Sequence, residues 1–231
     1  MKKISKLTVI TTLITLLPIV LGIALYDRLP DVVATHWGID NQPNGWSSKA
    51  MAAFGMPGIL ALINLVCSTA MEICPDRPFV KVRPVSIKAV GGWEKENKLA
   101  DKVSPRLMWL CRWIIPVLSL ILVPVMLYSA MGVSFDMDRI VCSILGIMFI
   151  IIGNYLPKCR RNGVVGIKIP WTLSSDENWD KTHRFAGFVW IVCGAAAIVG
   201  GWTKPVVVIV ALVAMILLPV VYSGILKHKG I

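Results

Sequence analysis

The sequence predicts an all-α polytopic membrane protein with six transmembrane helices and both termini in the cytoplasm. Of its 231 residues, 56% are hydrophobic, and the mean hydropathy is +0.71. Only 16% are charged, against about 25% in soluble domains. Six apolar stretches are each about 20 residues long, which is the length of helix that crosses a ~30 Å hydrocarbon core. Basic residues gather in alternate loops, and this asymmetry predicts the orientation.

The same composition excludes several classes of protein. A disordered chain would be polar, and a soluble nucleic-acid-binding protein would spread its basic charge over a hydrophilic surface. A disulfide-stapled secreted domain would be shorter and richer in cysteine than six in 231. What remains is an integral membrane protein whose loops carry the net charge of +11.

Each apolar stretch is predicted to be a helix, because a helix satisfies its own backbone polar groups in lipid. The predicted spans are Leu7–Tyr26, Met51–Cys74, Leu107–Ala130, Arg139–Pro157, His183–Trp202 and Pro205–Leu226. The first span follows a basic start, as a signal peptide would. Its apolar run is longer than the ~7–15 residues of a signal peptide, and no clear small-residue cleavage site follows, so we expect a retained anchor.

The orientation follows from the distribution of lysine and arginine. Nineteen of the 24 lie in the N-terminus, the 75–106 and 158–184 loops and the C-terminus, and four lie in the 27–50, 131–139 and 203–204 segments. Cytoplasmic loops carry the excess of basic residues in membrane proteins. We therefore expect both termini and both long basic loops in the cytoplasm, and no nucleic-acid partner.

Few polar residues interrupt the spans. Glu72 and Arg112 lie near predicted inner ends, where they could form an ion pair, the interpretation we favour, or snorkel separately to the interface. Asn64 lies near a span centre, where a hydrogen bond between helices explains it better than a substrate site does. Ion pumps and transporters usually place ionisable residues near mid-membrane, so this scarcity weighs against coupled transport.

Small residues recur every four positions on the fifth span, at Cys193, Ala197 and Gly201. This spacing allows helices to approach closely. We expect the fifth span to lie centrally in the bundle; a dimerisation seam is the alternative.

The loop between the first two spans is predicted to form a small extended hairpin. Val32–Trp37 is rich in β-favouring residues, and residues 43–45 (Pro-Asn-Gly) are a turn signal. His36 and Trp37 could form an interfacial aromatic anchor with a hydrogen-bonded histidine, or part of an external recognition surface. The candidate outer residues are His36, Trp37, Gly45 and Trp46.

The loop between the fourth and fifth spans is long, polar and rich in tryptophan. Ser174 and Glu177 have the spacing of a capping box, which predicts a helix that starts there and can run directly into the fifth span. Trp179 and His183 are four residues apart and should share a helix face. Packing at the membrane surface could also explain the tryptophans.

Acidic groups and one histidine in this loop could serve acid–base chemistry, but the sequence lacks a nucleophile motif, a metal-ligand spacing and a phosphate cradle. His36 and His183 are predicted on opposite sides of the membrane and cannot share a zinc ion within one protomer. We expect no enzyme, no cofactor and no metal.

Two motifs resemble known families. The pattern Leu-Pro…Thr-His-Trp…Gly-Trp-Ser-Ser-Lys of residues 29–49 resembles DUF1648, a domain of unknown function. Residues 153–187 read Gly-Asn-Tyr-Leu-Pro-Lys…Asn…Gly-Ile-Lys-Ile-Pro-Trp-Thr-Leu-Ser-Ser-Asp-Glu-Asn-Trp…Lys-Thr-His-Arg-Phe-Ala-Gly, which strongly resembles the SdpI family. On this basis residues 1–74 form a DUF1648-like region, 75–106 a cytoplasmic loop, and 107–231 an SdpI-like four-span region with the motif loop 158–182.

The resemblance implies a bacterial plasma-membrane protein that gives immunity to a secreted antimicrobial peptide toxin. It also implies a sensor that can draw a small cytosolic autorepressor to the membrane, and no enzymatic activity. The expected partners are thus the lipid bilayer, a peptide toxin outside and a repressor inside.

The inner motif could be a binding site or a structural plug, with tryptophans contacting a partner or lipid and with capping and Asp/Arg groups ordering the loop. Its candidate residues are Asn154, Pro157, Lys158, Asn162, Gly166, Pro170, Trp171, Thr172, Ser174, Asp176, Glu177, Trp179, Thr182, His183 and Arg184. Two other functions stay open. A small-solute or lipid transporter would need a polar cavity reaching mid-membrane. A membrane-interface enzyme would need Asp176, Glu177 and His183 to converge on one cleft.

Overall fold

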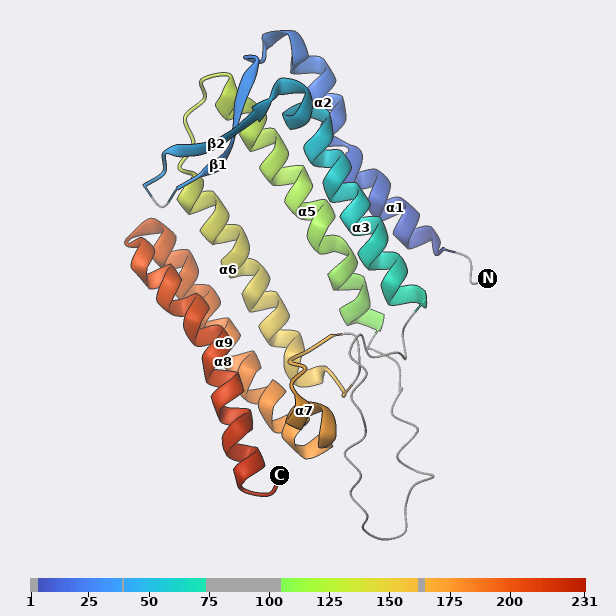
Figure 1. Cartoon of the computed structure of the whole chain (residues 1–231), viewed down its shortest axis with the longest axis vertical. Coiled ribbons are helices and arrows are strands. Elements are labelled where there is room, and N and C mark those ends of the chain that lie inside the picture. The colour runs from blue at the N-terminus through green and yellow to red at the C-terminus, as the bar shows by residue number, and fades with distance from the viewer. Residues whose placement is uncertain (1–3, 39, 74–104, 162–164) are drawn as a thin grey trace. The chain divides into compact units, whose positions relative to one another are not determined.

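The structure is a computed structural model that describes residues 4–38, 40–73, 105–161 and 165–231 (Figure 1). Six helical segments of this described part are long and apolar enough to cross a membrane, so the chain is a multi-pass membrane protein, as predicted. Their bounds are Lys6–Arg28, Met51–Glu72, Met108–Ala130, Met137–Lys158, Asp176–Trp202 and Pro205–His228.

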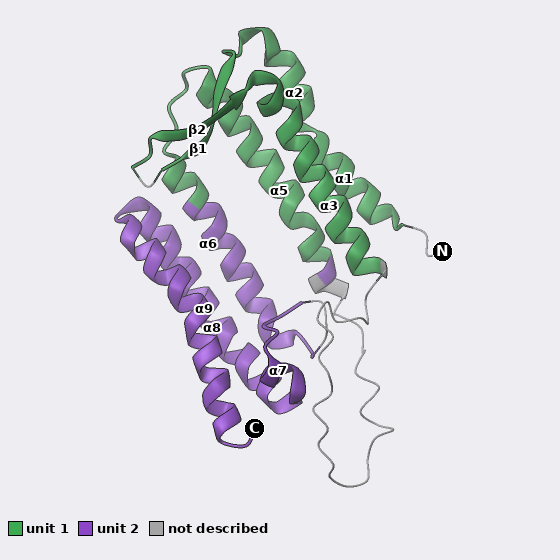
Figure 2. Cartoon of the chain, in the orientation of Figure 1, with its two compact units in different colours: residues 1–73, 109–141 green, residues 74–108, 142–231 purple. Residues whose placement is uncertain are grey.

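The chain forms two compact units (Figure 2). Unit 1 consists of residues 1–73 and 109–141, and unit 2 consists of residues 74–108 and 142–231. Unit 1 therefore combines the first three spans with the start of the fourth, and unit 2 contains the last two spans with the rest of the fourth.

In unit 1, the first span is built from two helices in series, α1 (Lys6–Leu16) and α2 (Pro18–Leu25), and ends in the 3₁₀ turn η1 (Tyr26–Arg28). Pro18 has no backbone N–H to donate, so it begins a new helix instead of continuing α1. Ser5 is the N-cap of α1, and its hydroxyl accepts a backbone N–H of the first turn.

The second span starts with a π-helical turn, η2 (Met51–Gly55), and continues as α3 (Met56–Ile73). The third span is α5 (Pro105–Ala130), which stays helical through Pro116 and Pro124. Membrane helices tolerate such prolines because packed neighbours can satisfy the carbonyls that a proline leaves without a donor.

The predicted hairpin is present. Strands β1 (Val32–Trp37) and β2 (Pro43–Ser48) pair antiparallel. The position of its turn differs from the prediction, because residues 43–45 belong to β2 and the turn comes before them, where the N–H of Gly38 donates to the carbonyl of Gln42. The Pro-Asn-Gly signal was wrong here since the strand pairing extends to Pro43.

Asn41 explains why the turn forms earlier. Its φ of +57° lies in the left-handed region, which asparagine enters more readily than most residues do. The Asn41 side-chain oxygen also accepts the backbone N–H of Met137 at 2.9 Å. Met137 is the first residue of α6 (Met137–Tyr155), so the turn is tied to the start of the fourth span.

The apolar core of unit 1 lies where the hairpin meets the ends of the first three spans. Gly22 permits this packing, because a Cβ there would lie 2.8 Å from the carbonyl oxygen of Ala53. The buried core residues are Leu25, Leu29, Val33, Ala52, Ala53, Val123, Met126 and Leu127.

In unit 2, the fourth span continues into the 3₁₀ turn η3 (Leu156–Lys158). The short helix α7 (Pro170–Ser174) precedes the long α8 (Asp176–Trp202), and α9 (Pro205–His228) returns antiparallel to α8 (Figure 1). The predicted helix that runs into the fifth span is thus confirmed. Its N-cap, however, is Ser175 rather than Ser174, because the Ser175 hydroxyl accepts the N–H of Asn178.

Paired glycines bring α6 and α8 into backbone contact. A Cβ on Gly146 would lie 2.5 Å from the carbonyl oxygen of Gly194, and one on Gly153 would lie 2.8 Å from that of Gly187. The two glycines of α6 are seven residues apart, as are the two of α8, and seven residues make two helical turns. The contact between the helices therefore repeats two turns further along their antiparallel crossing.

The predicted small-residue stripe on α8 has a different neighbour. Cys193 packs with Ala211 and Met215 of α9, whereas Gly187 and Gly194 of α8 meet α6. Within unit 2, α8 therefore contacts both other spans, as expected of a central helix.

Candidate functional site

Two stacked aromatic rings lie at the centre of the 158–184 motif. Trp179 and His183 share a face of α8, as their spacing predicted, and are 0% and 1% exposed. Their ring centroids are 3.9 Å apart, with 20° between the planes. The indole N–H of Trp179 donates to the carbonyl of Cys159 at 2.7 Å, and Nδ1 of His183 lies 2.8 Å from the carbonyl oxygen of Trp179. Because that oxygen can only accept, Nδ1 carries the proton.

The segment around Gly166 crosses these rings. The backbone N–H of Ile167 donates to Nε2 of His183 at 2.9 Å, so the imidazole is neutral and uses both nitrogens. Gly166 has a φ of +126°, and a Cβ there would lie 2.6 Å from Nε2 of His183 and 2.8 Å from the Trp179 ring. Both the conformation and the close approach therefore require glycine.

A second buried network joins α8 to α9. The carboxamide nitrogen of Asn178 donates to the carbonyls of Ser223 and Ile231, each at 3.1 Å. Its oxygen accepts from the hydroxyls of Ser223 and Thr182. The side chains of Asn178, Thr182 and Ser223 are fully buried, and the network gives Asn178 four hydrogen bonds, the full capacity of a carboxamide.

Helix α7 is fastened by Thr172 and Arg161. The Thr172 hydroxyl lies 2.7 Å from the carbonyl of Ile167, to which it donates, and 3.1 Å from the N–H of Ile169, from which it accepts. Arg161 donates to the carbonyl of Leu173 at 2.6 Å and forms an ion pair with Asp176. This ion pair is an Asp/Arg contact of the kind expected to order the loop.

The candidate inner residues thus divide between a buried face and an exposed rim. Thr172, Trp179, Thr182 and His183 are buried, Gly166 and Trp171 are half-buried, and the remaining described candidates are exposed. Those exposed residues are Asn154, Pro157, Lys158, Pro170, Ser174, Asp176, Glu177 and Arg184. Asn162 lies outside the described residues.

The rim residues make their own contacts. Glu177 forms an ion pair with Lys181 at 2.7 Å, and the Lys227 ammonium lies 5.1 Å from the centre of the Trp171 ring. Asp176 binds Arg161, whereas His183 is bound to backbone groups. The two acids and the histidine proposed for an interface enzyme therefore have separate partners. In the described part of the chain, no group of three or more His, Cys, Asp or Glu side chains could hold a metal ion.

The candidate outer residues all lie on the hairpin. Nδ1 of His36 is within hydrogen-bond distance of the Asn44 side-chain oxygen, as expected of a hydrogen-bonded histidine. Trp37 packs against the apolar core of unit 1, and Trp46 is 59% exposed. Gly45 is needed for close pairing, because a Cβ there would lie 2.9 Å from the Cβ of His36.

An ion pair closes the base of the hairpin. The Lys49 ammonium lies 2.9 Å from the Asp31 carboxylate. The hydrogen bond and the positive charge of Lys49 lower the pKa of the Asp31 carboxyl below its usual range. Both groups are at the surface, so solvent screens the interaction.

A polar cluster in unit 1 joins three spans and was only partly predicted. The expected pair of Glu72 and Arg112 is present, at 3.0 Å. The Glu72 carboxylate also accepts from the backbone N–H of Ser5 at 3.0 Å and from the hydroxyl of Thr8. The predicted interhelical bond of Asn64 is also present, since its side-chain amide lies 3.2 Å from the hydroxyl of Thr11.

The threonines of α1 were missed. Thr8, Thr11 and Thr15 are each 0% exposed and follow one another at intervals of three and four residues, so they form one face of the helix. That spacing is a polar helical stripe within an apolar run, and it could have indicated the face that packs inward.

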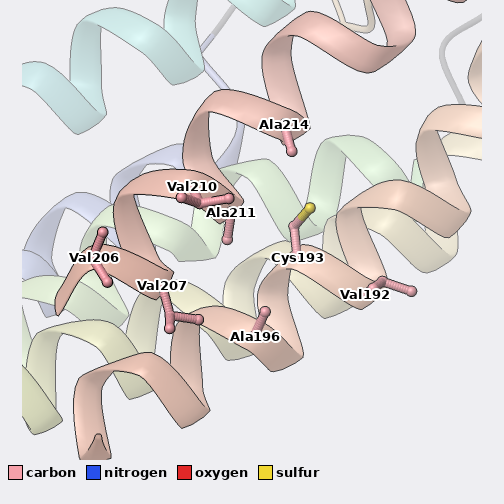
Figure 3. Close-up of a pocket in the computed structure, with 8 residues that line it drawn as sticks. All are labelled: Val192, Cys193, Ala196, Val206, Val207, Val210, Ala211 and Ala214. Carbon is pink, nitrogen blue, oxygen red and sulfur yellow. The ribbon is translucent and has the colours of Figure 1, made fainter. Parts of the chain in front are cut away.

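An apolar groove of about 330 Å³ lies between α8 and α9, in the half nearer their connecting turn (Figure 3). It is lined by Val192, Cys193, Ala196, Val206, Val207, Val210, Ala211 and Ala214. These side chains can bind hydrocarbon but supply no charged group.

The chain is similar to known proteins over both motifs. Residues 158–223 match the SdpI/YfhL protein family, and residues 13–61 match the domain of unknown function DUF1648. The immunity protein SdpI of Bacillus subtilis (strain 168) is 24% identical over 223 residues, which cover 96% of this chain and 95% of that protein. No solved structure matches. These matches confirm both resemblances that the motifs predicted.

Proposed function

We propose that this chain is an SdpI-type immunity protein that protects a bacterial plasma membrane against a secreted antimicrobial peptide toxin. One observation carries the proposal: the chain aligns with an immunity protein along nearly the whole length of both proteins. The DUF1648 match lies near the N-terminus and the SdpI/YfhL match near the C-terminus, so the likeness is not confined to one span.

The basic residues support an orientation with both termini in the cytoplasm. The hairpin would then face outward, where Trp46 is 59% exposed and available to a peptide at the membrane surface. Amphipathic aromatic rings favour this interfacial position. Contact between the peptide and the hairpin would keep the toxin from inserting elsewhere in the bilayer.

Expression in toxin-sensitive bacteria tests the proposal. Cells that carry the membrane-inserted chain should survive a dose of peptide toxin that kills cells with an empty vector. Unchanged killing by every peptide toxin of the source and neighbouring strains, at confirmed membrane expression, would refute an immunity role.

Substitution of two tryptophans of similar exposure then tests whether the peptide contacts the hairpin. Trp46 is 59% exposed on the hairpin, and Trp202 is 61% exposed at the end of α8. If the hairpin receives the peptide, Trp46→Ala should reduce survival, whereas Trp202→Ala should leave it unchanged at equal expression. Equal effects of the two substitutions would count against the hairpin as the contact site.

For the 158–184 motif we propose both roles left open by the sequence, assigned to different faces. The buried network around Trp179, His183 and Asn178 supports a structural plug. The exposed rim, which includes Glu177 and Arg184, supports contact with a small cytosolic repressor. Arg184→Glu should then abolish toxin-induced relief of repression while immunity persists, and Lys229→Glu, an exposed position outside the rim, tests whether any added acid has this effect. Joint loss of both activities would contradict a separate signalling surface.

The geometry supports catalysis less well. Asp176, Glu177 and His183 have separate partners, and the imidazole uses both nitrogens in hydrogen bonds to backbone groups. We therefore favour a non-enzymatic role. A transporter remains the alternative that one observation favours, namely the polar cluster between α1, α3 and α5.

A further inference from the structure

Polar groups form a continuous seam between α1, α3 and α5 of unit 1. At one end the Glu72 carboxylate contacts Ser5, Thr8 and Arg112. Ser68 lies on α3 one helical turn before Glu72, and Asn64 lies one turn before Ser68. The side-chain amide of Asn64 reaches Thr11 of α1. In the amide orientation that satisfies both ends of the side chain, its oxygen accepts from the Thr11 hydroxyl and its nitrogen donates to the Arg112 carbonyl of α5, each at 3.2 Å.

A final contact extends the seam. The hydroxyl of Ser119 on α5 donates to the carbonyl of Thr15 on α1 at 2.8 Å. Both side chains are 0% exposed. The seam therefore runs for about two turns of each helix, from the ion pair to this serine.

Some polar atoms in the seam have no protein partner. The Ser68 hydroxyl is fully buried, and neither it nor Nε of Arg112 has a hydrogen-bond partner among the residues that the structure describes. Ser68 lies four residues from both Asn64 and Glu72, so the three share one face of α3. Glu72 binds the Arg112 guanidinium, and Asn64 reaches the Arg112 carbonyl. Since Ser68 lies between them on the same face, its side chain faces Arg112 as well.

Unpaired polar groups are costly where lipid surrounds the helices, since no bulk solvent replaces the missing bond. Buried polar groups without a protein partner are commonly satisfied by ordered water, which makes about three hydrogen bonds. We propose that water occupies the seam beside Ser68 and Arg112 and enters from the end at Glu72. The Glu72 side chain, at 14% exposure, leaves that end accessible.

The opposite end of the seam is closed by apolar side chains. One turn beyond Ser119, Val123 is 3% exposed, and Met126 and Leu127 follow at 5% and 0%. These residues belong to the apolar core of unit 1. The hydrated seam is thus a dead end, open at Glu72 and closed by the apolar core at its other end.

Neighbouring positions on α3 provide a sharp test. The test compares two variants that each contain a single cysteine, after the other native cysteines have been replaced. One variant keeps Cys67, and the other carries Ser68→Cys. Silver ion is the small aqueous probe that reacts with the thiol. Cys67 is exposed on the outer face of α3, which would meet lipid, and lies at nearly the same depth as the fully buried Ser68. Ser68→Cys should be modified at least tenfold faster than Cys67. Equal or slower modification of a folded Ser68→Cys protein would overturn the proposal.

A second variant separates bound water from a dry, unpaired hydroxyl. If water binds Ser68, Ser68→Ala removes hydrogen bonds and should lower the midpoint of thermal unfolding. A dry hydroxyl would give the opposite result, because its removal relieves a buried polar group. A raised midpoint would therefore overturn the hydrated seam, whatever the outcome for immunity.

Discussion

The imidazole of His183 lies flat against the indole of Trp179 one helical turn earlier, with the ring centroids 3.9 Å apart. Each ring is also hydrogen-bonded to the backbone of the preceding loop. Trp179 donates to the carbonyl of Cys159, and His183 accepts from the N–H of Ile167. The pair therefore fixes two points of the loop before α8 to the start of that helix.

Replacement of Trp179 by phenylalanine should show how much the indole hydrogen bond to Cys159 contributes to the free energy of unfolding. Trp179→Phe keeps an aromatic ring on His183 but leaves the buried Cys159 carbonyl without this donor. The loss should cost about 1–3 kcal/mol of unfolding free energy, as expected for an unsatisfied buried acceptor. Thermal unfolding in detergent, followed by near-UV circular dichroism, measures it. The exposed Trp109→Phe is the control, and an equal change in both would contradict the assignment.

Gly166→Ala should destabilise the same loop for a different reason. Alanine is strained at a φ of +126°, and its Cβ would come within 2.6 Å of His183 Nε2. Backbone strain of this kind costs on the order of 1–3 kcal/mol before the steric clash is counted. Gly132→Ala is the control, because φ there is +92° but nothing lies within 4 Å of the added Cβ. The difference between their unfolding midpoints should isolate the contact with the rings; no difference would refute it.

The glycine crossing of α6 and α8 makes a third prediction. In Gly194→Ala the new Cβ would lie 2.7 Å from the Gly146 carbonyl oxygen, so the helices must separate and lose packing. We expect destabilisation of about 1–3 kcal/mol, typical of overpacking. Gly224→Ala in α9 meets nothing within 4 Å and should stabilise by up to ~1 kcal/mol through helix propensity. Opposite shifts in unfolding midpoint would confirm the crossing, and equal shifts would contradict it.

Hydropathy and charge predicted the membrane fold because the bilayer imposes a fixed helix length. Local signals were less exact. The Pro-Asn-Gly sequence suggested a turn at 43–45, but strand pairing prevailed and Asn41 formed the turn. The capping box was placed one residue early, since both serines before α8 are plausible caps and only the backbone decides between them.

The candidate site was predictable to the extent that its residues share one helix. The four-residue spacing of Trp179 and His183 indicated a common face. Their contacts with Cys159 and Ile167, and the link from Asn178 to Ser223, depend on how segments 16 to 45 residues apart fold together. No periodicity within a single helix contains that information.

Loss of one member of the Glu72–Arg112 pair should be more harmful than loss of both. Glu72→Gln leaves the guanidinium, whose side chain is 10% exposed, without its carboxylate and weakens the anchor of α1 at Ser5. Breaking a buried pair on one side typically costs about 3–5 kcal/mol, because an uncompensated charge remains. Access of solvent at this end of the seam should place the cost near the lower limit.

A double-mutant cycle measures the coupling. Glu72→Gln, Arg112→Gln and the combined variant are compared by reversible unfolding in mixed micelles. The double variant should lose less stability than either single variant, and therefore less than the sum of the two, since neither charge remains unpaired. Glu177→Gln, which breaks the exposed pair with Lys181, provides the control and should cost only about 0.3–0.5 kcal/mol. Strict additivity at Glu72 and Arg112 would show that the two side chains act independently, and the ion pair would then not hold the three spans together.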